Sequence, residues 1–247
     1  MRKLLVSGCS FTVSYDHTGW ANSLANHYDV PCHNYASQGA GNNFISRSII
    51  HGVSEHLKNY NADDLFVTVM WSGAGRMEIY RSDISDLLED FTTDENPISL
   101  VDQNVHWLKL RSHLDEKYSR AWYDIFYDDV FADICTLENI LRVQWFLKLH
   151  NIKYVMTVFA PSCLPEEHNR NNPDIKYLYD MIDWGKFVDV NSCMEWCHYE
   201  SGLPMDTNEK EKTAIYARHP TPDQHNAFTK QILIPFIDKL YPNLKEN

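Results

Sequence analysis

The sequence predicts an α/β protein, a three-layer α/β/α sandwich built on a mostly parallel central sheet of about five strands. Short apolar runs of strand length alternate along the chain with longer runs of helical periodicity, and strands joined through helices pair in parallel with right-handed crossovers. The chain has 247 residues, of which 44% are hydrophobic, enough to bury one large core. We therefore expect residues 1–247 to form a single domain.

Five apolar runs are expected to form the sheet. The clearest is 65–71 (LFVTVMW), which is continuously apolar or β-branched, as is typical of a strand buried on both faces. A shorter run at 3–6 begins the chain, and a second long run occupies 152–159. The segments 30–35 and 187–190 complete the expected set.

Four segments have the periodicity of amphipathic helices: 18–28, 42–60, 129–149 and 223–240. In the first, Trp20 begins an apolar face that repeats every four residues. The last begins with a capping box, because Thr221 is followed three residues later by Gln224, and Pro222 occupies the first helical position. Pro235 is expected to bend or shorten this helix.

Residues 77–128 do not follow the alternation of strands and helices. Acidic and aromatic residues are mixed there without a clear period, so we expect an insertion of short helices and loops. From Glu78 to Asp133 the chain holds 14 acidic and 5 basic residues. This balance indicates a solvated acidic surface.

Composition limits the partners and the location of the protein. The formal net charge of −12 disfavours a nucleic-acid partner, because binding phosphates requires a concentrated basic surface. The apolar run near the start is too short for a signal peptide and no run is long enough to cross a bilayer, so we expect a cytoplasmic protein without a membrane span. Six cysteines are scattered along a chain too long to need disulfide bonds, so reduced thiols are expected.

Neither a metal nor an organic cofactor is expected. Cys193, Cys197 and His198 lack a second ligand pair at the spacing of a zinc site. Residues 39–43 (GAGNN) are glycine-rich and precede a helix, but they have neither the lysine nor the GxGxxG pattern of a phosphate-binding loop.

Small and polar residues follow three of the expected strands, at 8–10, 39–43 and 72–75. Because the carboxyl ends of parallel strands meet at one edge of the sheet, we expect these segments to converge. A strand that ends on Gly-x-Ser can turn sharply and expose the serine hydroxyl, so Ser10 is the candidate nucleophile, with a simple turn residue as the alternative. Cys9 is expected to point into the core, as buried free cysteines usually do.

Ser10 needs a general base, because an unassisted hydroxyl is a poor nucleophile at neutral pH. Among the 12 histidines, His219 is the best placed, since it lies just before the last expected helix, where a loop at the sheet edge would hold it. The capping box that begins at Thr221 leaves His219 and Pro220 outside the helix. His219 therefore has no capping role of its own and is the expected base.

In order and spacing, these motifs resemble the SGNH (GDSL-like) hydrolase superfamily of esterases and lipases. Residues 8–12 (GCSFT) match the first family block except for its acid, and 34–39 (NYASQG) resemble the second block. The pair His219-Pro220 resembles the last block, and Trp20 and Leu24 fall where the first helix of the family often has a tryptophan and a leucine. The resemblance covers both ends of the chain and leaves out the insertion.

The resemblance implies a flavodoxin-like sandwich and hydrolysis of a small or carbohydrate-linked acyl ester. Ser10 would be the nucleophile and His219 its base, while the N–H groups of Ser10 and Gly39 would bind the oxyanion. Asn42 is expected to add a side-chain donor. No cofactor is implied.

This sequence departs from the family pattern at the third block. It supplies an asparagine after the third strand, where this chain has Ser72-Gly73-Ala74-Gly75. Asn42, Asn43 or the Ser72 hydroxyl could donate instead. Arg76 follows directly and could face the site, binding a substrate carboxylate or sugar hydroxyl, or could pair with the acidic insertion.

This sequence also departs from the family pattern at the acid of the catalytic triad. Its position, three residues before the histidine, is Tyr216 in this chain. An acid from elsewhere, with Asp206, Glu209 and Glu211 as candidates, or a backbone carbonyl would have to orient His219, since triads are defined by geometry and not by sequence order.

Two alternative functions use the same fold. A binding protein that has lost the chemistry would present the aromatic residues of the insertion as its contact surface: Trp107, Trp122, Tyr123 and Tyr127. An acyltransferase would use Ser10 and His219 and differ only in what excludes water. The sequence leaves open the acyl group and the oligomeric state.

Overall fold

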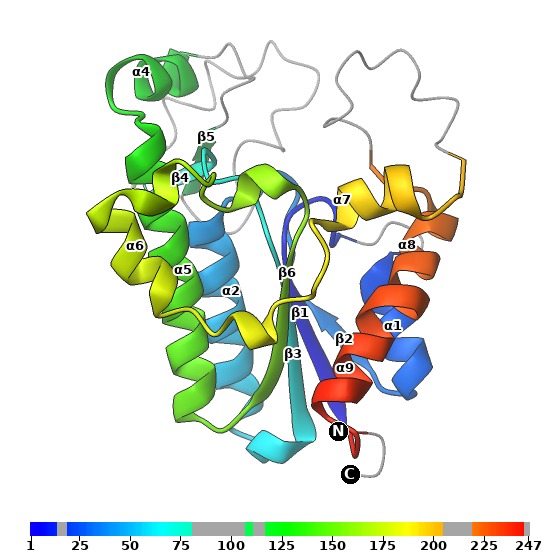
Figure 1. The fold of residues 1–247 in the computed structure, drawn as a ribbon. Coiled ribbons are helices and arrows are strands. Elements are labelled where there is room, and N and C mark those ends of the chain that lie inside the picture. The colour runs from blue at the N-terminus through cyan, green and yellow to red at the C-terminus, as the bar shows by residue number, and fades with distance from the viewer. Residues whose placement is uncertain (14–18, 81–106, 111–116, 205–218, 245–247) are drawn as a thin grey trace.

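The computed structural model of the protein describes residues 1–13, 19–80, 107–110, 117–204 and 219–244. The central sheet has the strand order β2-β1-β3-β6 (Figure 1), and all three neighbouring pairs are parallel. The strands are β1 (Lys3–Ser7), β2 (Cys32–Asn34), β3 (Leu65–Trp71) and β6 (Lys153–Val158). The expected α/β class with a mostly parallel sheet is confirmed.

Helices cover both faces of this sheet (Figure 1). One layer contains α2 (Asn42–His56), α5 (Asp129–Leu149) and α6 (Pro173–Asp180), and the other contains α1 (Trp20–Tyr28), α8 (Pro222–Phe228) and α9 (Ile234–Leu240). In the first layer α2 packs on α5 and α5 on α6, and in the second α1 packs on α8. This arrangement is the expected three-layer sandwich.

The remaining helical segments in the described part of the sandwich are short. They are α7 (Cys193–Glu195), π-helical turns at Trp196–Glu200 and Thr229–Leu233, and 3-10 turns at Ala62–Asp64, Pro161–Cys163, Asn169–Asn171 and Trp184–Lys186.

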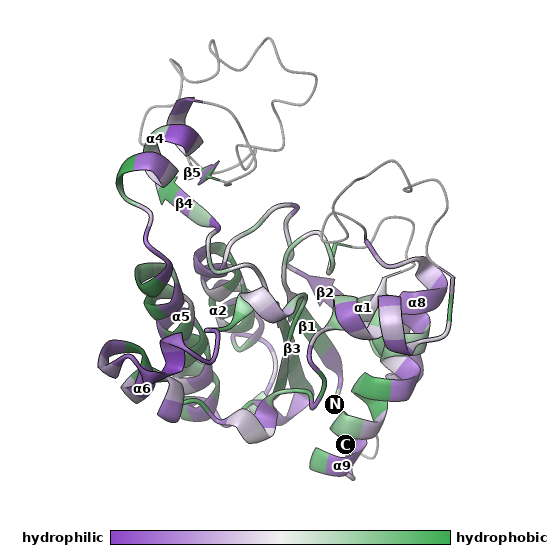
Figure 2. Ribbon diagram, turned by 45° about the horizontal axis from the view of Figure 1, so that its top comes forward, coloured by the Kyte–Doolittle hydropathy of each residue, from purple (hydrophilic) through white to green (hydrophobic). Residues whose placement is uncertain are grey.

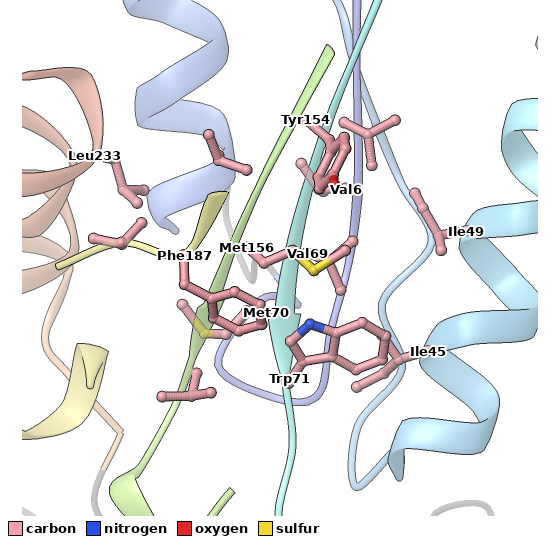
Figure 3. Close-up of a cluster of buried hydrophobic side chains, with 14 of the residues drawn as sticks. Val6, Ile45, Ile49, Val69, Met70, Trp71, Tyr154, Met156, Phe187 and Leu233 are labelled. Atoms are coloured by element: carbon pink, nitrogen blue, oxygen red, sulfur yellow. The ribbon is translucent and has the colours of Figure 1, made fainter. Parts of the chain in front are cut away.

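The core lies where β3 runs between the two helical layers. All seven residues of β3 are buried, as its continuous apolar run predicts. Trp71 lies on the side of Ile45 and Ile49 from α2, whereas Leu233 lies on the opposite side (Figure 3), and all four side chains are fully buried. Because protein interiors are close-packed, the packing of β3 between the two helical layers fixes the position of the strand and of the loop that follows it.

Local sequence signals set the helix boundaries. α5 begins at Asp129 because the Asp128 carboxylate accepts a hydrogen bond from the Phe131 N–H (2.9 Å), and the bounds agree with the expected 129–149. α1 and α2 are shorter than expected, and α2 ends at His56. The last helix is divided by the π-helical turn Thr229–Leu233, directly before the segment that contains Pro235, which has no N–H to donate.

The segment 187–190 does not form the expected fifth strand. Phe187 makes only an isolated parallel bridge with Met156, whose carbonyl accepts the Val188 N–H (2.9 Å). The Val190 N–H then bonds to the Val188 carbonyl (2.9 Å), which turns the chain after a single pair. The central sheet therefore has four strands where the sequence predicted about five.

The insertion contains a hairpin that the sequence did not predict. β4 (Met77–Tyr80) and β5 (Trp107–Leu110) pair in antiparallel fashion, followed by α4 (Lys117–Ile125). The expectation of short helices and loops is wrong for this hairpin. Leu108 and Leu110 form a small second core, against which Trp122 and Tyr123 pack. The hairpin and α4 lie beyond the ends of α2 and α5 (Figure 2).

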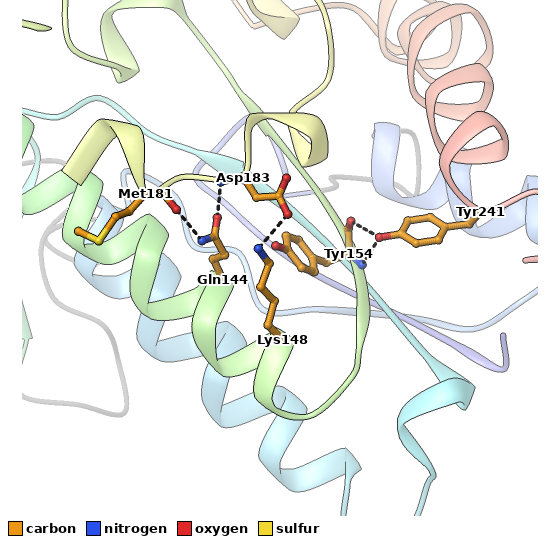
Figure 4. Close-up of polar contacts among 6 residues, drawn as sticks. All are labelled: Gln144, Lys148, Tyr154, Met181, Asp183 and Tyr241. Atoms are coloured by element: carbon orange, nitrogen blue, oxygen red, sulfur yellow. Dashed lines mark hydrogen bonds and ion pairs between the residues drawn. The ribbon is translucent and has the colours of Figure 1, made fainter. Parts of the chain in front are cut away.

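Polar contacts near the start of β6 stabilise the end of the sandwich that lies opposite the carboxyl ends of the strands (Figure 4). Gln144 on α5 accepts the Asp183 N–H (2.7 Å), and Lys148 forms an ion pair with the Asp183 carboxylate (2.9 Å). Tyr241 accepts the Tyr154 N–H (3.3 Å) and donates to the Tyr154 carbonyl (3.0 Å). These contacts fasten α5 to the loop that contains Asp183, and the C-terminal segment to the sheet.

The carboxyl ends of the four strands lie along one edge of the sheet, at the top in Figure 1. Ser7 at the end of β1 is in register with Val69 of β3, and Trp71 is in register with Val158 of β6. The loops after β1 and β2 touch there, because the Ser37 N–H donates to the Gly8 carbonyl (3.2 Å).

Candidate active site

A tight turn at the end of β1 presents Ser10. The N–H groups of Thr12 and Val13 both donate to the Cys9 carbonyl (2.9 and 3.1 Å), so the chain reverses directly after the strand. A Cβ atom at Gly8 would lie 2.1 Å from Thr12 Oγ1, so only glycine fits there. The Cys9 thiol is fully buried, as expected, whereas Ser10 is partly exposed.

His219 lies close to Ser10 although the two residues are near opposite ends of the sequence. The two residues are 209 positions apart, yet His219 Nε2 lies 2.8 Å from Ser10 Oγ. The capping box at Thr221 forms as expected and begins α8, which leaves His219 two residues outside the helix. Its ring packs on Phe11 with 4.7 Å between centroids. With Nε2 unprotonated, the serine hydroxyl donates to the imidazole, which is the arrangement that general base catalysis requires.

A second histidine lies near His219. His225 on α8 is buried, and burial, followed by the proximity of His219, lowers its pKa to about 4. A neutral imidazole at this position adds no positive charge beside His219. The candidate acids Asp206, Glu209 and Glu211, and also Tyr216, lie outside the described residues.

Gly39 lies in a β-turn beside the Ser10 loop. The Ala40 N–H donates to the Ser37 carbonyl (3.1 Å), and Gly39 has a φ of 69°. A positive φ at the third position is typical of a type II turn and favours glycine. Within the described part of the chain, the backbone N–H groups of Ser10 and Gly39 donate to no other backbone group.

Asn42 is not an oxyanion donor in this structure, so the sequence-based expectation is wrong. Its Nδ2 donates to the Ser72 carbonyl and to Thr136 Oγ1 (both 3.0 Å), and its Oδ1 accepts the Ser72 N–H (2.8 Å). Both amide hydrogens are therefore used inside the protein. Asn42 instead fixes the backbone of the loop after β3.

Ser72 and Arg76 lie at the same edge as the Ser10 turn. Ser72 is buried, and its Oγ accepts a hydrogen bond from Arg76 Nη1 (2.9 Å). The Arg76 guanidinium lies over the ring of Phe159 (5.2 Å to the centroid). Phe159 contacts Phe11 (4.8 Å between centroids), and Phe11 in turn contacts His219. A row of aromatic rings thus connects the Arg76 side chain to His219.

Sequence reasoning missed the side chains that surround these groups. Phe11 and Phe159 follow different strands, and nothing in the local pattern indicates that their rings meet. Glu78 and Lys109 of the hairpin contact the segment 37–44 that contains Gly39. Their partners lie 37 and 72 positions away in the chain, so no spacing rule could have found them.

The described residues offer no arrangement of three or more His, Cys, Asp or Glu side chains that could hold a metal ion. In the same part of the chain, every helix is too short or too polar to cross a membrane.

The solved structures with a similar fold include the following two. A member of the lipolytic protein G-D-S-L family from Veillonella parvula has a TM-score of 0.45 and 10% sequence identity, covering 98% of this chain and 99% of that chain. An acetyl xylan esterase from the rumen bacterium Butyrivibrio proteoclasticus has a TM-score of 0.40 and 12% identity, covering 98% of this chain and 64% of that chain.

Comparison with curated proteins gives no match. The family model of DUF6071, a family of unknown function, matches residues 11–243 of the 247 residues. Since this match spans nearly the whole chain, the protein belongs to the DUF6071 family.

Proposed function

We propose that this protein is a serine esterase that hydrolyses a small or carbohydrate-linked acyl ester. The observation that carries the proposal is the 2.8 Å distance between Ser10 Oγ and His219 Nε2. A hydroxyl paired with an imidazole is the arrangement that activates serine as a nucleophile. Ser10 is partly exposed and His219 is exposed, so an ester can reach both groups.

In the proposed mechanism, His219 Nε2 removes the proton from Ser10 Oγ as Oγ attacks the ester carbonyl. The N–H groups of Ser10 and Gly39 bind the oxyanion. The tetrahedral intermediate collapses, the bond to the alcohol oxygen breaks, and protonated His219 gives its proton to the leaving alkoxide. A water molecule, deprotonated by His219, then attacks the acyl carbon, which releases the carboxylic acid and returns the proton to Ser10.

Ser72 and Arg76 are proposed to bind the substrate. A guanidinium has five N–H donors, and the contact with Ser72 Oγ leaves others for a carboxylate or a sugar hydroxyl. Phe11 and Phe159 are buried between Arg76 and His219, so their rings hold these two groups in place from the protein side.

The aromatic residues of the insertion do not favour the alternative of a binding protein. Trp122 and Tyr123 pack against the hairpin, and the Tyr127 hydroxyl donates to the Asp129 carboxylate (2.7 Å). The side chain of Trp107 lies outside the described residues. The exposure of His219 favours hydrolysis over acyl transfer, because transfer requires the exclusion of water.

Labelling with a fluorophosphonate probe tests the proposal. The native protein should react with the probe, with the adduct located on Ser10 by mass spectrometry, and Ser10→Ala and His219→Ala should abolish the reaction. Ser54→Ala removes a partly exposed serine near the C-terminal end of α2, away from the carboxyl edge of the sheet, and serves as the matched control. Hydrolysis of p-nitrophenyl acetate and of an O-acetylated oligosaccharide would then identify the class of alcohol. A folded native protein that does not react with the probe would overturn the proposal.

A further inference from the structure

Two buried charged side chains of the hairpin are not used in the proposed mechanism. Glu78 on β4 is 4% exposed and Lys109 on β5 is 3% exposed, and the two residues are directly opposite in the strand register. Burying a charge costs free energy unless specific partners compensate. Both side chains find such partners in the segment 37–44, which contains Gly39.

Lys109 contacts the first half of this segment. Its Nζ donates to Ser37 Oγ (2.7 Å) and to the Gln38 carbonyl (3.2 Å). The Gln38 carbonyl and the Gly39 N–H belong to the same peptide group, which is planar and trans, so the two point in opposite directions. A cation bound to this oxygen therefore fixes the direction of the Gly39 N–H. It also polarises the peptide group and makes the N–H a stronger donor.

The type of the turn decides how the contact of Lys109 with the Gln38 carbonyl affects the Gly39 N–H. The turn from Ser37 to Ala40 has Gly39 at a φ of 69°, as in a type II turn. Types I and II differ mainly in the orientation of their central peptide group, which in this turn joins Gln38 to Gly39. Glycine accepts either sign of φ, so Gly39 does not select the orientation by itself.

Glu78 holds the second half of the segment. Its carboxylate accepts hydrogen bonds from the N–H groups of Gly41 and Phe44, at the N-terminus of α2. A carboxylate is favoured at this end of a helix. Because Asn42 also ties α2 to the loop after β3, the C-terminal side of the turn is fixed, and the remaining freedom is the rotation of the Gln38–Gly39 peptide group.

We propose that Lys109 is a positioning residue that orients and polarises the Gly39 N–H as an oxyanion donor, so that the inserted hairpin completes the active site. The inference rests on the proposed function. It explains why a lysine is buried in an insertion that lies outside the sandwich, and it makes the hairpin a requirement for catalysis beyond any effect on substrate access.

Lys109→Met tests the proposal, with Lys117→Met as the matched control because Lys117 is an exposed lysine of the same insertion. Loss of an oxyanion donor costs ~100-fold or more in rate. A misoriented donor keeps part of its effect, so Lys109→Met should lower kcat and the rate of fluorophosphonate labelling by about 10- to 100-fold, with KM nearly unchanged. Lys109→Arg, which restores a cationic donor, should recover much of the rate. An unchanged kcat in Lys109→Met would overturn the proposal.

An NMR measurement separates this inference from the proposed function. In the ¹⁵N-labelled protein, Lys109→Met should shift the Gly39 amide resonance strongly, and Lys117→Met should leave it in place. If the native protein is not labelled on Ser10, the esterase proposal fails while the Gly39 resonance still reports whether Lys109 sets the peptide group. If Lys109→Met does not fold, Lys109→Gln replaces it, and a Gly39 resonance and labelling rate equal to the native values contradict the inference.

Discussion

Asn42 is buried among three hydrogen bonds that join α2 to the loop after β3. Asn42→Ala leaves the Ser72 peptide groups and the Thr136 hydroxyl without these partners, so the free energy of unfolding should fall by about 2–4 kcal/mol. Urea denaturation measures this loss, with the partly exposed neighbour Asn43→Ala as the control. Full stability combined with a ~100-fold fall in kcat would instead make Asn42 an oxyanion donor.

The Arg76 guanidinium has a defined position, because it is held by Ser72 Oγ and by the face of Phe159. If it binds an anionic acyl group, Arg76→Ala should raise KM for p-nitrophenyl succinate by about 10- to 100-fold, as expected for a lost hydrogen bond to a charged group. KM for p-nitrophenyl butyrate, which has no carboxylate, should change little. An equal increase in KM for both esters would mean that Arg76 maintains the shape of the site and does not bind the carboxylate.

At the scale of elements, the start of α8 links helix stability to the position of His219. Thr221 Oγ1 accepts the Gln224 N–H (3.2 Å), and the Gln224 side chain accepts the Thr221 N–H (2.9 Å). Thr221→Ala should cost about 1 kcal/mol of stability. It should also lower kcat several-fold, because the segment that carries His219 loses its anchor. Thr221→Ser keeps the cap and should restore both quantities, whereas reduced stability with an unchanged kcat would separate the cap from the site.

The elements that the sequence predicted well are those with local signals. β3 is a continuous apolar run, α5 has an N-terminal cap and a long periodic pattern, and the capping box at Thr221 marked the start of α8. The short parallel strands β1, β2 and β6 were predicted to within a few residues. Their parallel pairing also followed, because strands joined through helices pair in parallel with right-handed crossovers.

The elements that the sequence missed depend on distant partners. Each strand of the hairpin has only four residues. The hairpin is stabilised by packing on α4 and by contacts of Glu78 and Lys109 with the segment 37–44. Residues 187–190 have strand-like composition, but the turn at Val190 ends the pairing. Asn42 was misassigned because its side-chain amide suited a donor role, while its actual partners come from the loop after β3 and from α5.

At the scale of the whole molecule, the site joins segments that are far apart in the chain. Ser10 follows β1, Gly39 follows β2, Arg76 follows β3, and His219 precedes α8. The parallel sheet brings the first three to one edge, and the packing of α8 on α1 brings the fourth. Global unfolding should therefore separate Ser10 from His219, which makes the stability of the sandwich a condition for activity.

His225 makes that stability depend on pH. Its pKa is about 4 in the folded protein against 6.5 for a free histidine, mainly because it is buried. As the pH falls below 6.5, the unfolded chain takes up a proton that the folded protein does not bind until about pH 4, so protonation favours unfolding. The free energy of unfolding should therefore decrease between pH 6.5 and pH 4, by on the order of 3 kcal/mol from this group.

His225→Phe isolates this contribution, because phenylalanine fills a similar volume and does not titrate. Carboxylates and the more distant histidines act on both proteins alike, so the difference between the two stability curves reports His225 together with its coupling to His219. Urea denaturation across this pH range should show the native protein losing stability relative to the variant as the pH falls, with the difference constant above pH 7. Parallel curves would mean that His225 takes up its proton in the folded state as readily as in the unfolded chain, and that the α8 segment behind His219 admits water.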